Sequence, residues 1–150
     1  MELQQARTNE WYTAILVLSI LIPVLYVIYL LMILQENGQS IEGLLKSQPI
    51  YGVLMLVAFI NPIWGHFLKH IPKGERVKEG RGDRFLTYLL VSQIAVGNIV
   101  MLVLALLAKR RLPRASEPQP LTILEKMVSL ALLALSLFAG YLLLRFIFFV

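Results

Sequence analysis

Four stretches of the chain consist almost entirely of apolar residues, and each is long enough to cross a membrane. They cover about residues 11–34, 50–68, 85–108 and 123–150. About 20 helical residues are enough to cross the hydrocarbon layer of a bilayer. Polar and charged residues collect between these stretches. The pattern therefore predicts an all-α, polytopic membrane protein with four transmembrane helices in a compact bundle, forming a single domain from residue 1 to residue 150.

Prolines fall inside two of the predicted helices. Pro23 lies near the middle of the first, where a proline removes one backbone hydrogen bond and is expected to kink the helix. In the second, Asn61 precedes Pro62, and this order is favoured at the start of a helix. The second helix is therefore expected to be either kinked or broken at this point. A break would turn the positive end of a half-helix toward the interior of the bundle.

Most amides that lie deep in an apolar stretch belong to the second and third predicted helices. With their neighbours they form a polar cluster of Asn61, Pro62, Gln93, Gly97 and Asn98. Asn61 lies seven residues inside Leu68, and Gln93 lies eight inside Phe85. If the two helices are antiparallel neighbours, Asn61 and Gln93 are nearly level, and we expect an interhelical amide pair. Asn98 lies deeper and would need its own partner.

The last predicted helix carries signals for both its start and its packing. Thr122 and Glu125 have the spacing of a capping box. Ser129, Ser136 and Gly140 lie on one stripe, in which Ser136 and Gly140 form a small-xxx-small pair. Small residues at this spacing let transmembrane helices approach closely. We therefore expect this stripe to face another helix.

Composition and charge support a lipid environment. Of the 150 residues, 58% are hydrophobic and only 15% are charged, whereas soluble domains are about a quarter charged. The net charge is +5, and the basic residues flank the apolar stretches, so anionic lipid headgroups rather than nucleic acid are the expected anion. The expected headgroup contacts are Lys69, Lys73, Arg76, Lys78, Arg81, Arg84, Lys109, Arg110 and Arg111.

The distribution of basic residues favours one orientation only slightly. With four spans, the N-terminus, the loop at 69–85 and the C-terminus share one side and carry eight Lys and Arg, against six on the other. The positive-inside rule then places both termini inside, in a membrane that we expect to be a bacterial plasma membrane. The basic loop at 109–120 would face outward unless a segment failed to span. The strongly apolar 85–108 stretch argues against such a failure there.

Few residues suggest catalysis or metal binding. His66 and His70 are spaced i, i+4, which would place them on one helical face, as zinc ligands often are. A third ligand would have to come from Asp83, Glu75 or Glu79. The chain has no cysteine, which excludes disulfides and thiolate metal sites. The two histidines thus remain candidate metal ligands, while no metal or other cofactor is expected.

These observations favour a non-catalytic membrane protein. We expect an accessory, immunity-like or interaction subunit that binds another membrane protein or a second copy of itself. The alternative is a small oligomeric channel or transporter, in which Asn61, Gln93 and Asn98 would line a path for a neutral solute or an ion. A membrane enzyme that uses His66 and His70 is a third possibility.

Overall fold

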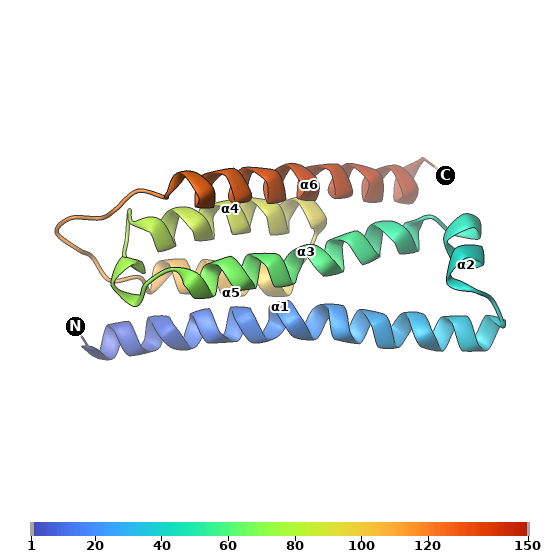
Figure 1. Ribbon diagram of the computed structural model, residues 1–150, viewed down its shortest axis with the longest axis horizontal. Helices are drawn as coiled ribbons and strands as arrows, with labels where there is room; N and C mark the ends of the chain where they lie inside the picture. Colours follow the sequence, from blue (N-terminus) through green and yellow to red (C-terminus); the bar gives the residue numbers. More distant parts are fainter. Residues whose placement is uncertain (1, 150) are drawn as a thin grey trace.

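The computed structural model describes residues 2–149, and all regular structure in this range is helical (Figure 1). The elements are α1 (Glu2–Asn37), α2 (Ile41–Ser47), α3 (Ile50–His70), the short 3-10 helix η1 (Lys73–Glu75), α4 (Arg81–Val96), α5 (Ile99–Arg110) and α6 (Ile123–Phe148). The predicted all-α class is therefore confirmed.

Three of these helices are long and apolar enough to cross a membrane. They are Ala6–Asn37 within α1, the whole of α3, and α6. Only 22% to 33% of the residues in their most apolar segments are buried, so most of their apolar side chains face outward. An outward apolar surface on helices of this length indicates a membrane protein. The predicted count of four spans is not confirmed.

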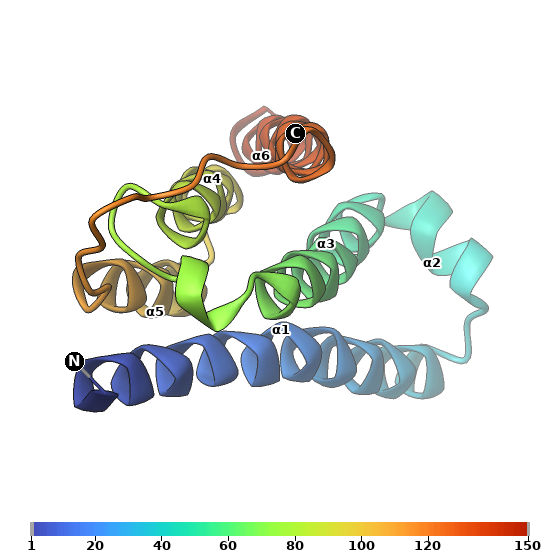
Figure 2. The same ribbon diagram turned by 60° about the vertical axis from the view of Figure 1, so that its left-hand side comes forward.

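The difference lies in the third predicted helix, which is two helices rather than one. α4 ends at Val96, and Gly97 takes a left-handed conformation with φ of 71°. The amides of Gly97 and Asn98 donate to the carbonyl oxygens of Ile94 and Gln93, which is the Schellman pattern of a helix end. Asn98 then caps α5 through its side chain, which accepts from the amide of Met101. The chain reverses, and α4 and α5 form a hairpin (Figures 1 and 2).

Of the two alternatives expected at Asn61-Pro62, a kink or a break, the break does not occur. α3 runs as one helix from Ile50 to His70 with Pro62 inside it, and α1 likewise continues through Pro23. A proline in a membrane helix removes one backbone hydrogen bond, and packing against neighbouring helices compensates for this loss. α3 has such neighbours in α1, α4 and α6. The half-helix interpretation of this segment is therefore wrong.

The hairpin determines which loops lie together. The start of α1, the end of α3, the start of α4, the end of α5 and the start of α6 lie at one end, on the left in Figure 1. We call this the basic end, because twelve of the fourteen Lys and Arg residues belong to these helix ends and to the segments 71–80 and 111–122 that connect them. α2 and the C-terminus lie at the other end. The start of α1 and the end of α6 thus lie at opposite ends of the bundle, whereas the four-span prediction placed them on one side.

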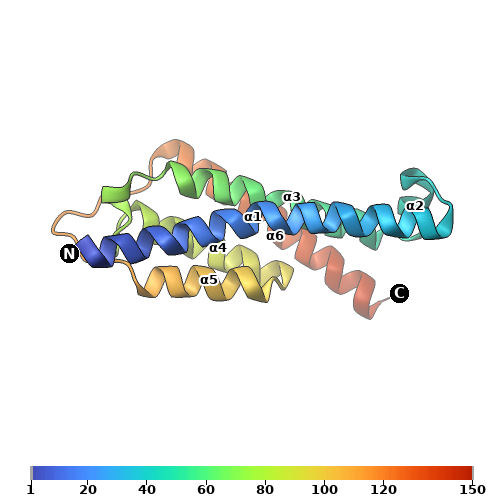
Figure 3. The same cartoon turned by 90° about the horizontal axis from the view of Figure 1, so that it is seen from below.

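The core lies in the half of the bundle near the basic end, where α4 and α5 join the longer helices. Trp64 packs edge-on against Phe85, with ring centroids 5.2 Å apart. Leu89 of α4 and Met101 of α5 are fully buried and belong to the same hydrophobic cluster. Beyond the hairpin the bundle thins, and α6 diverges from α1 and α3 toward its C-terminus (Figure 3).

Candidate functional site

The amide pair expected at mid-depth is present between α3 and α4. Nε2 of Gln93 donates to Oδ1 of Asn61 at 3.2 Å, and both side chains are 1% exposed. Nδ2 of Asn61 and Oε1 of Gln93 have no hydrogen-bond partner in the described part of the chain. The pair thus makes one interhelical hydrogen bond and leaves one donor group and one acceptor group in the interior without a partner among the described residues.

A second polar contact joins α3, α4 and α6. Nε1 of Trp64 donates to Oγ of Ser92 at 3.2 Å, and Ser92 Oγ lies 2.5 Å from Ser136 Oγ. The Ser136 hydroxyl also donates to the carbonyl oxygen of Leu132 at 2.8 Å. Sequence reasoning placed Ser136 on the packing stripe but did not predict the link to Trp64. An indole that enters an apolar interior normally finds an acceptor, which is the signal that could have predicted it.

The stripe on α6 packs against α4. Ser129, Ser136 and Gly140 are all buried. A Cβ atom on Gly140 would lie 2.1 Å from the carbonyl oxygen of Ala95, so the helices approach to backbone contact there. Oγ of Ser129 has no hydrogen-bond partner among residues 2–149. The stripe is therefore where α6 approaches the hairpin most closely.

The remaining members of the polar cluster separate from the amide pair. Pro62 lines a cleft on another side of α3 together with His66 and Lys69. Gly97 is exposed at the hairpin turn, and Asn98 is the cap of α5. Asn61 and Asn98 do, however, both line a cleft of about 370 Å³ between α1, α3 and the hairpin turn. The rest of its lining comes from apolar and tyrosine side chains of α1, α3 and α5.

The two histidines lie at the end of α3 and are exposed. Their ring centroids are 4.3 Å apart, and Nδ1 of His70 is 2.8 Å from the carbonyl oxygen of His66. Within the described residues no group of three or more His, Asp or Glu side chains could hold a metal ion. Asp83, a candidate third ligand, pairs with Lys109 instead. The structure therefore brings together two of the three ligands that a metal site would need.

Two of the residues predicted to contact lipid headgroups, Arg81 and Lys109, form ion pairs at the basic end. Arg81 pairs with Glu125, with Nε 3.1 Å from Oε2, and joins α4 to α6. Glu125 also completes the capping box with Thr122, as the spacing predicts. Lys109 pairs with Asp83, which joins α5 to α4. Arg81 and Lys109 are therefore partly committed to holding the helix ends together.

Arg76 corrects the expectation of headgroup contact, because it is buried. Nη1 donates to Oδ1 of Asn9 at 2.8 Å, and Nε donates to the carbonyl oxygen of Ile71 at 3.1 Å. Nη2 donates to the carbonyl oxygen of Lys69 at 3.2 Å, and the guanidinium carbon lies 4.4 Å from the centre of the Tyr12 ring. Burial lowers the pKa of the Arg76 guanidinium. This side chain fastens the 71–80 loop to α1.

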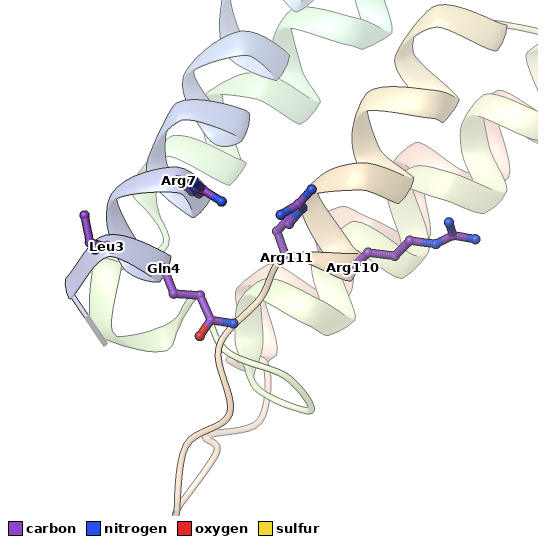
Figure 4. A pocket seen from close by; sticks show the side chains of 5 residues that line it. All are labelled: Leu3, Gln4, Arg7, Arg110 and Arg111. Carbon is purple, nitrogen blue, oxygen red and sulfur yellow. The ribbon is translucent and has the colours of Figure 1, made fainter.

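The other predicted headgroup residues are exposed at the basic end. They are Lys69, Lys73, Lys78, Arg84, Arg110 and Arg111. Arg110 and Arg111 line a cleft of about 610 Å³ together with Leu3, Gln4 and Arg7 of α1 (Figure 4). Arg7 and Arg111 lie on facing helix ends at this cleft, whereas Arg110 points away. Sequence reasoning did not include Arg7, because its nearness to Arg111 depends on the hairpin.

The described residues thus offer polar contacts that hold helices together, a mid-depth apolar cleft and an arginine-lined cleft. Hydroxyl and amide groups in the interior are arranged for hydrogen bonding rather than for proton transfer, since no ionisable group shares in their hydrogen bonds. Comparison of the chain with protein family models, with curated proteins and with solved structures found no match.

Proposed function

We propose that this protein spans a bacterial plasma membrane three times and that the α4–α5 hairpin enters the membrane without crossing it. α4 has 16 residues and α5 has 12. At 1.5 Å per residue these helices are about 24 Å and about 18 Å long, less than the roughly 30 Å of the hydrocarbon layer. Lys and Arg collect on the cytoplasmic side of membrane proteins. The basic end is therefore cytoplasmic, with the N-terminus inside and the C-terminus outside.

In this setting the protein acts as a non-catalytic accessory or interaction subunit of another membrane protein. The observation that supports this proposal is that the mid-depth polar groups form hydrogen bonds between helices. The amide pair of Asn61 and Gln93 and the hydroxyl pair of Ser92 and Ser136 all bond across helix interfaces. Polar groups arranged in this way stabilise a bundle in lipid. The interior polar groups thus stabilise the bundle itself, which leaves the outer surface to bind the partner.

The outer face of α6 is the surface on which we place that partner. Phe138 and Tyr141 are each more than half exposed, and at 3.6 residues per turn neither shares a helix face with Gly140, where α6 contacts α4. Large aromatic side chains dominate the energetics of protein interfaces. Crosslinking from this face separates contact with a protein partner from contact with lipid.

The test is photo-crosslinking in intact cells, with a benzophenone amino acid replacing Phe138 or Tyr141 one at a time. The expected result is one discrete crosslinked protein, which also copurifies in mild detergent at near-equal stoichiometry. Leu89, fully buried in the core, provides the matched control position, where only internal crosslinks should form. Crosslinks to lipid alone, or only to a second copy of the chain, would contradict a subunit role with a different membrane protein.

A small channel or carrier is the second candidate, because Asn61 and Asn98 line the same cleft. That cleft lies between α1, α3 and the hairpin turn, where a solute would find two amides. Flux through protein reconstituted in liposomes separates the two proposals. If Asn61→Leu leaves the bundle folded and abolishes flux, transport is supported. If it only lowers stability, the amide serves packing and the subunit proposal is favoured.

A further inference from the structure

We propose that the cleft between the start of α1 and the end of α5 binds a phosphate group through Arg7 and Arg111. The phosphate would come from the headgroup of an anionic phospholipid or from a free phosphate compound. The cleft has a volume of about 610 Å³, and its lining includes Gln4 beside the two arginines (Figure 4). This site does not depend on the accessory role proposed above.

The two arginines come from distant parts of the chain, and a hydrogen bond from the Thr8 side chain holds their helix ends together. The Thr8 hydroxyl shares its one proton between the carbonyl oxygen of Gln4 at 2.9 Å and that of Arg111 at 3.2 Å. Thr8 is fully buried, so this contact fixes the end of α5 against the first turns of α1. Arg7 and Arg111 are thereby brought to face one cleft, as Figure 4 shows. Thr8 acts as a positioning residue for both.

The described lining of the cleft carries positive charge and includes no acidic side chain. Leu3, Gln4, Arg7, Arg110 and Arg111 line it, and none of these is acidic. The structure records no ion pair for the three arginines among the described residues, although Arg81 and Lys109 nearby both have carboxylate partners. Like charges that face each other repel, and an anion between them removes this cost. A guanidinium presents a planar fork of donors that matches phosphate oxygens.

The position along α1 places the cleft at headgroup depth. Arg7 lies four residues before Trp11, so the two are about one helical turn, or about 6 Å, apart. Trp11 begins the apolar part of α1, where tryptophan favours the boundary between lipid and water. The guanidinium of Arg7 therefore lies on the aqueous side of this boundary, at the level of lipid phosphates.

The test is a binding titration of the full-length, detergent-purified protein with dioctanoyl phosphatidylglycerol and, separately, with inorganic phosphate. Arg7→Gln and Arg111→Gln are each expected to weaken binding about tenfold, because each removes a charge-assisted hydrogen bond. Arg7→Lys should weaken it less, because it keeps the charge and loses the fork. Binding of the lipid alone assigns the phosphate to a headgroup, and equal binding of inorganic phosphate assigns it to a soluble compound.

Arg114→Gln is the matched control, since Arg114 is exposed at the same end but does not line the cleft. It removes the same charge and should change affinity less than about threefold, the effect of general electrostatics. Size-exclusion elution checks that each variant keeps the fold. The proposal is overturned if neither ligand binds, if Arg7→Gln and Arg111→Gln bind like the wild type, or if Arg114→Gln loses as much affinity as they do.

Discussion

Small residues and polar residues do different work inside this bundle. Gly65 and Gly140 let helices approach closely. A Cβ atom on Gly65 would lie 2.1 Å from Ser19 Oγ, and one on Gly140 would lie 2.1 Å from the carbonyl oxygen of Ala95. Polar side chains such as Asn61 and Gln93 then bond across the interfaces. Helix association in lipid gains little from the hydrophobic effect, so close packing and interhelical hydrogen bonds provide the stability.

Gly140→Ala should destabilise the bundle by about 1–3 kcal/mol, because the new methyl group collides with a backbone atom that cannot rotate away. Thermal unfolding in detergent, followed by circular dichroism, measures the loss. Gly52→Ala is the matched control within α3, since its Cβ would meet only Leu45 Cδ2 at 3.6 Å. This control should be neutral or stabilising by up to about 1 kcal/mol. Equal effects of the two substitutions would contradict close α4–α6 contact at Gly140.

Depth along the sequence was enough to predict some contacts of single residues. Asn61 and Gln93 were expected to be level, and they form a hydrogen bond. Ser136 and Gly140 were expected on a packing stripe, and both are buried. Arg76 was assigned to the lipid surface, because nothing in its local sequence shows that Asn9 and Tyr12 will surround it. Contacts between neighbouring helices follow from spacing, whereas contacts of loops depend on the tertiary fold.

At the level of elements, the sequence suggested a possible break at Asn61-Pro62, whereas the structure breaks at Gly97-Asn98, inside a stretch predicted to be one helix. Asn61-Pro62 stays helical because only one backbone hydrogen bond is lost and α3 is packed on several sides. Gly97-Asn98 breaks because Gly97 adopts a left-handed conformation at little cost and Asn98 caps the next helix. A glycine after one helix followed by a capping residue is a known stop-and-start signal. The sequence analysis did not recognise this signal, because it lies within a long apolar stretch that has the length of a single membrane span.

The cap at the hairpin turn can be tested by substitution. Asn98→Ala removes the acceptor of the Met101 amide and should cost about 1 kcal/mol in the free energy of unfolding. Asn98→Ser keeps a capping oxygen and should lower the free energy of unfolding by only about 0.3 kcal/mol. Reversible unfolding in mixed micelles gives both values. Equal loss in the two variants would show that the side chain of Asn98 does not act as a cap.

For the whole molecule, the hairpin removes a conflict in the distribution of charge. With four spans, basic residues fall on both sides in similar numbers. With α4 and α5 reversing at Gly97, the loops at 71–80 and 111–122 lie at the same end, together with the start of α1. Only Lys46 and Arg145 remain toward the other end. The charge pattern was thus a signal for the fold, but the apolar character of residues 85–108 outweighed it.

The most direct test of this account is the side of the membrane on which residue 116 lies. The chain has no cysteine, so single cysteines can be placed at Ser40, Lys78 and Ser116, and labelled with a membrane-impermeant maleimide. In intact cells the label should reach Ser40→Cys alone, and after permeabilisation it should reach all three. Lys78→Cys and Ser116→Cys must therefore behave alike. Labelling of Ser116→Cys together with Ser40→Cys in intact cells would make residues 85–108 a full span and would contradict the hairpin.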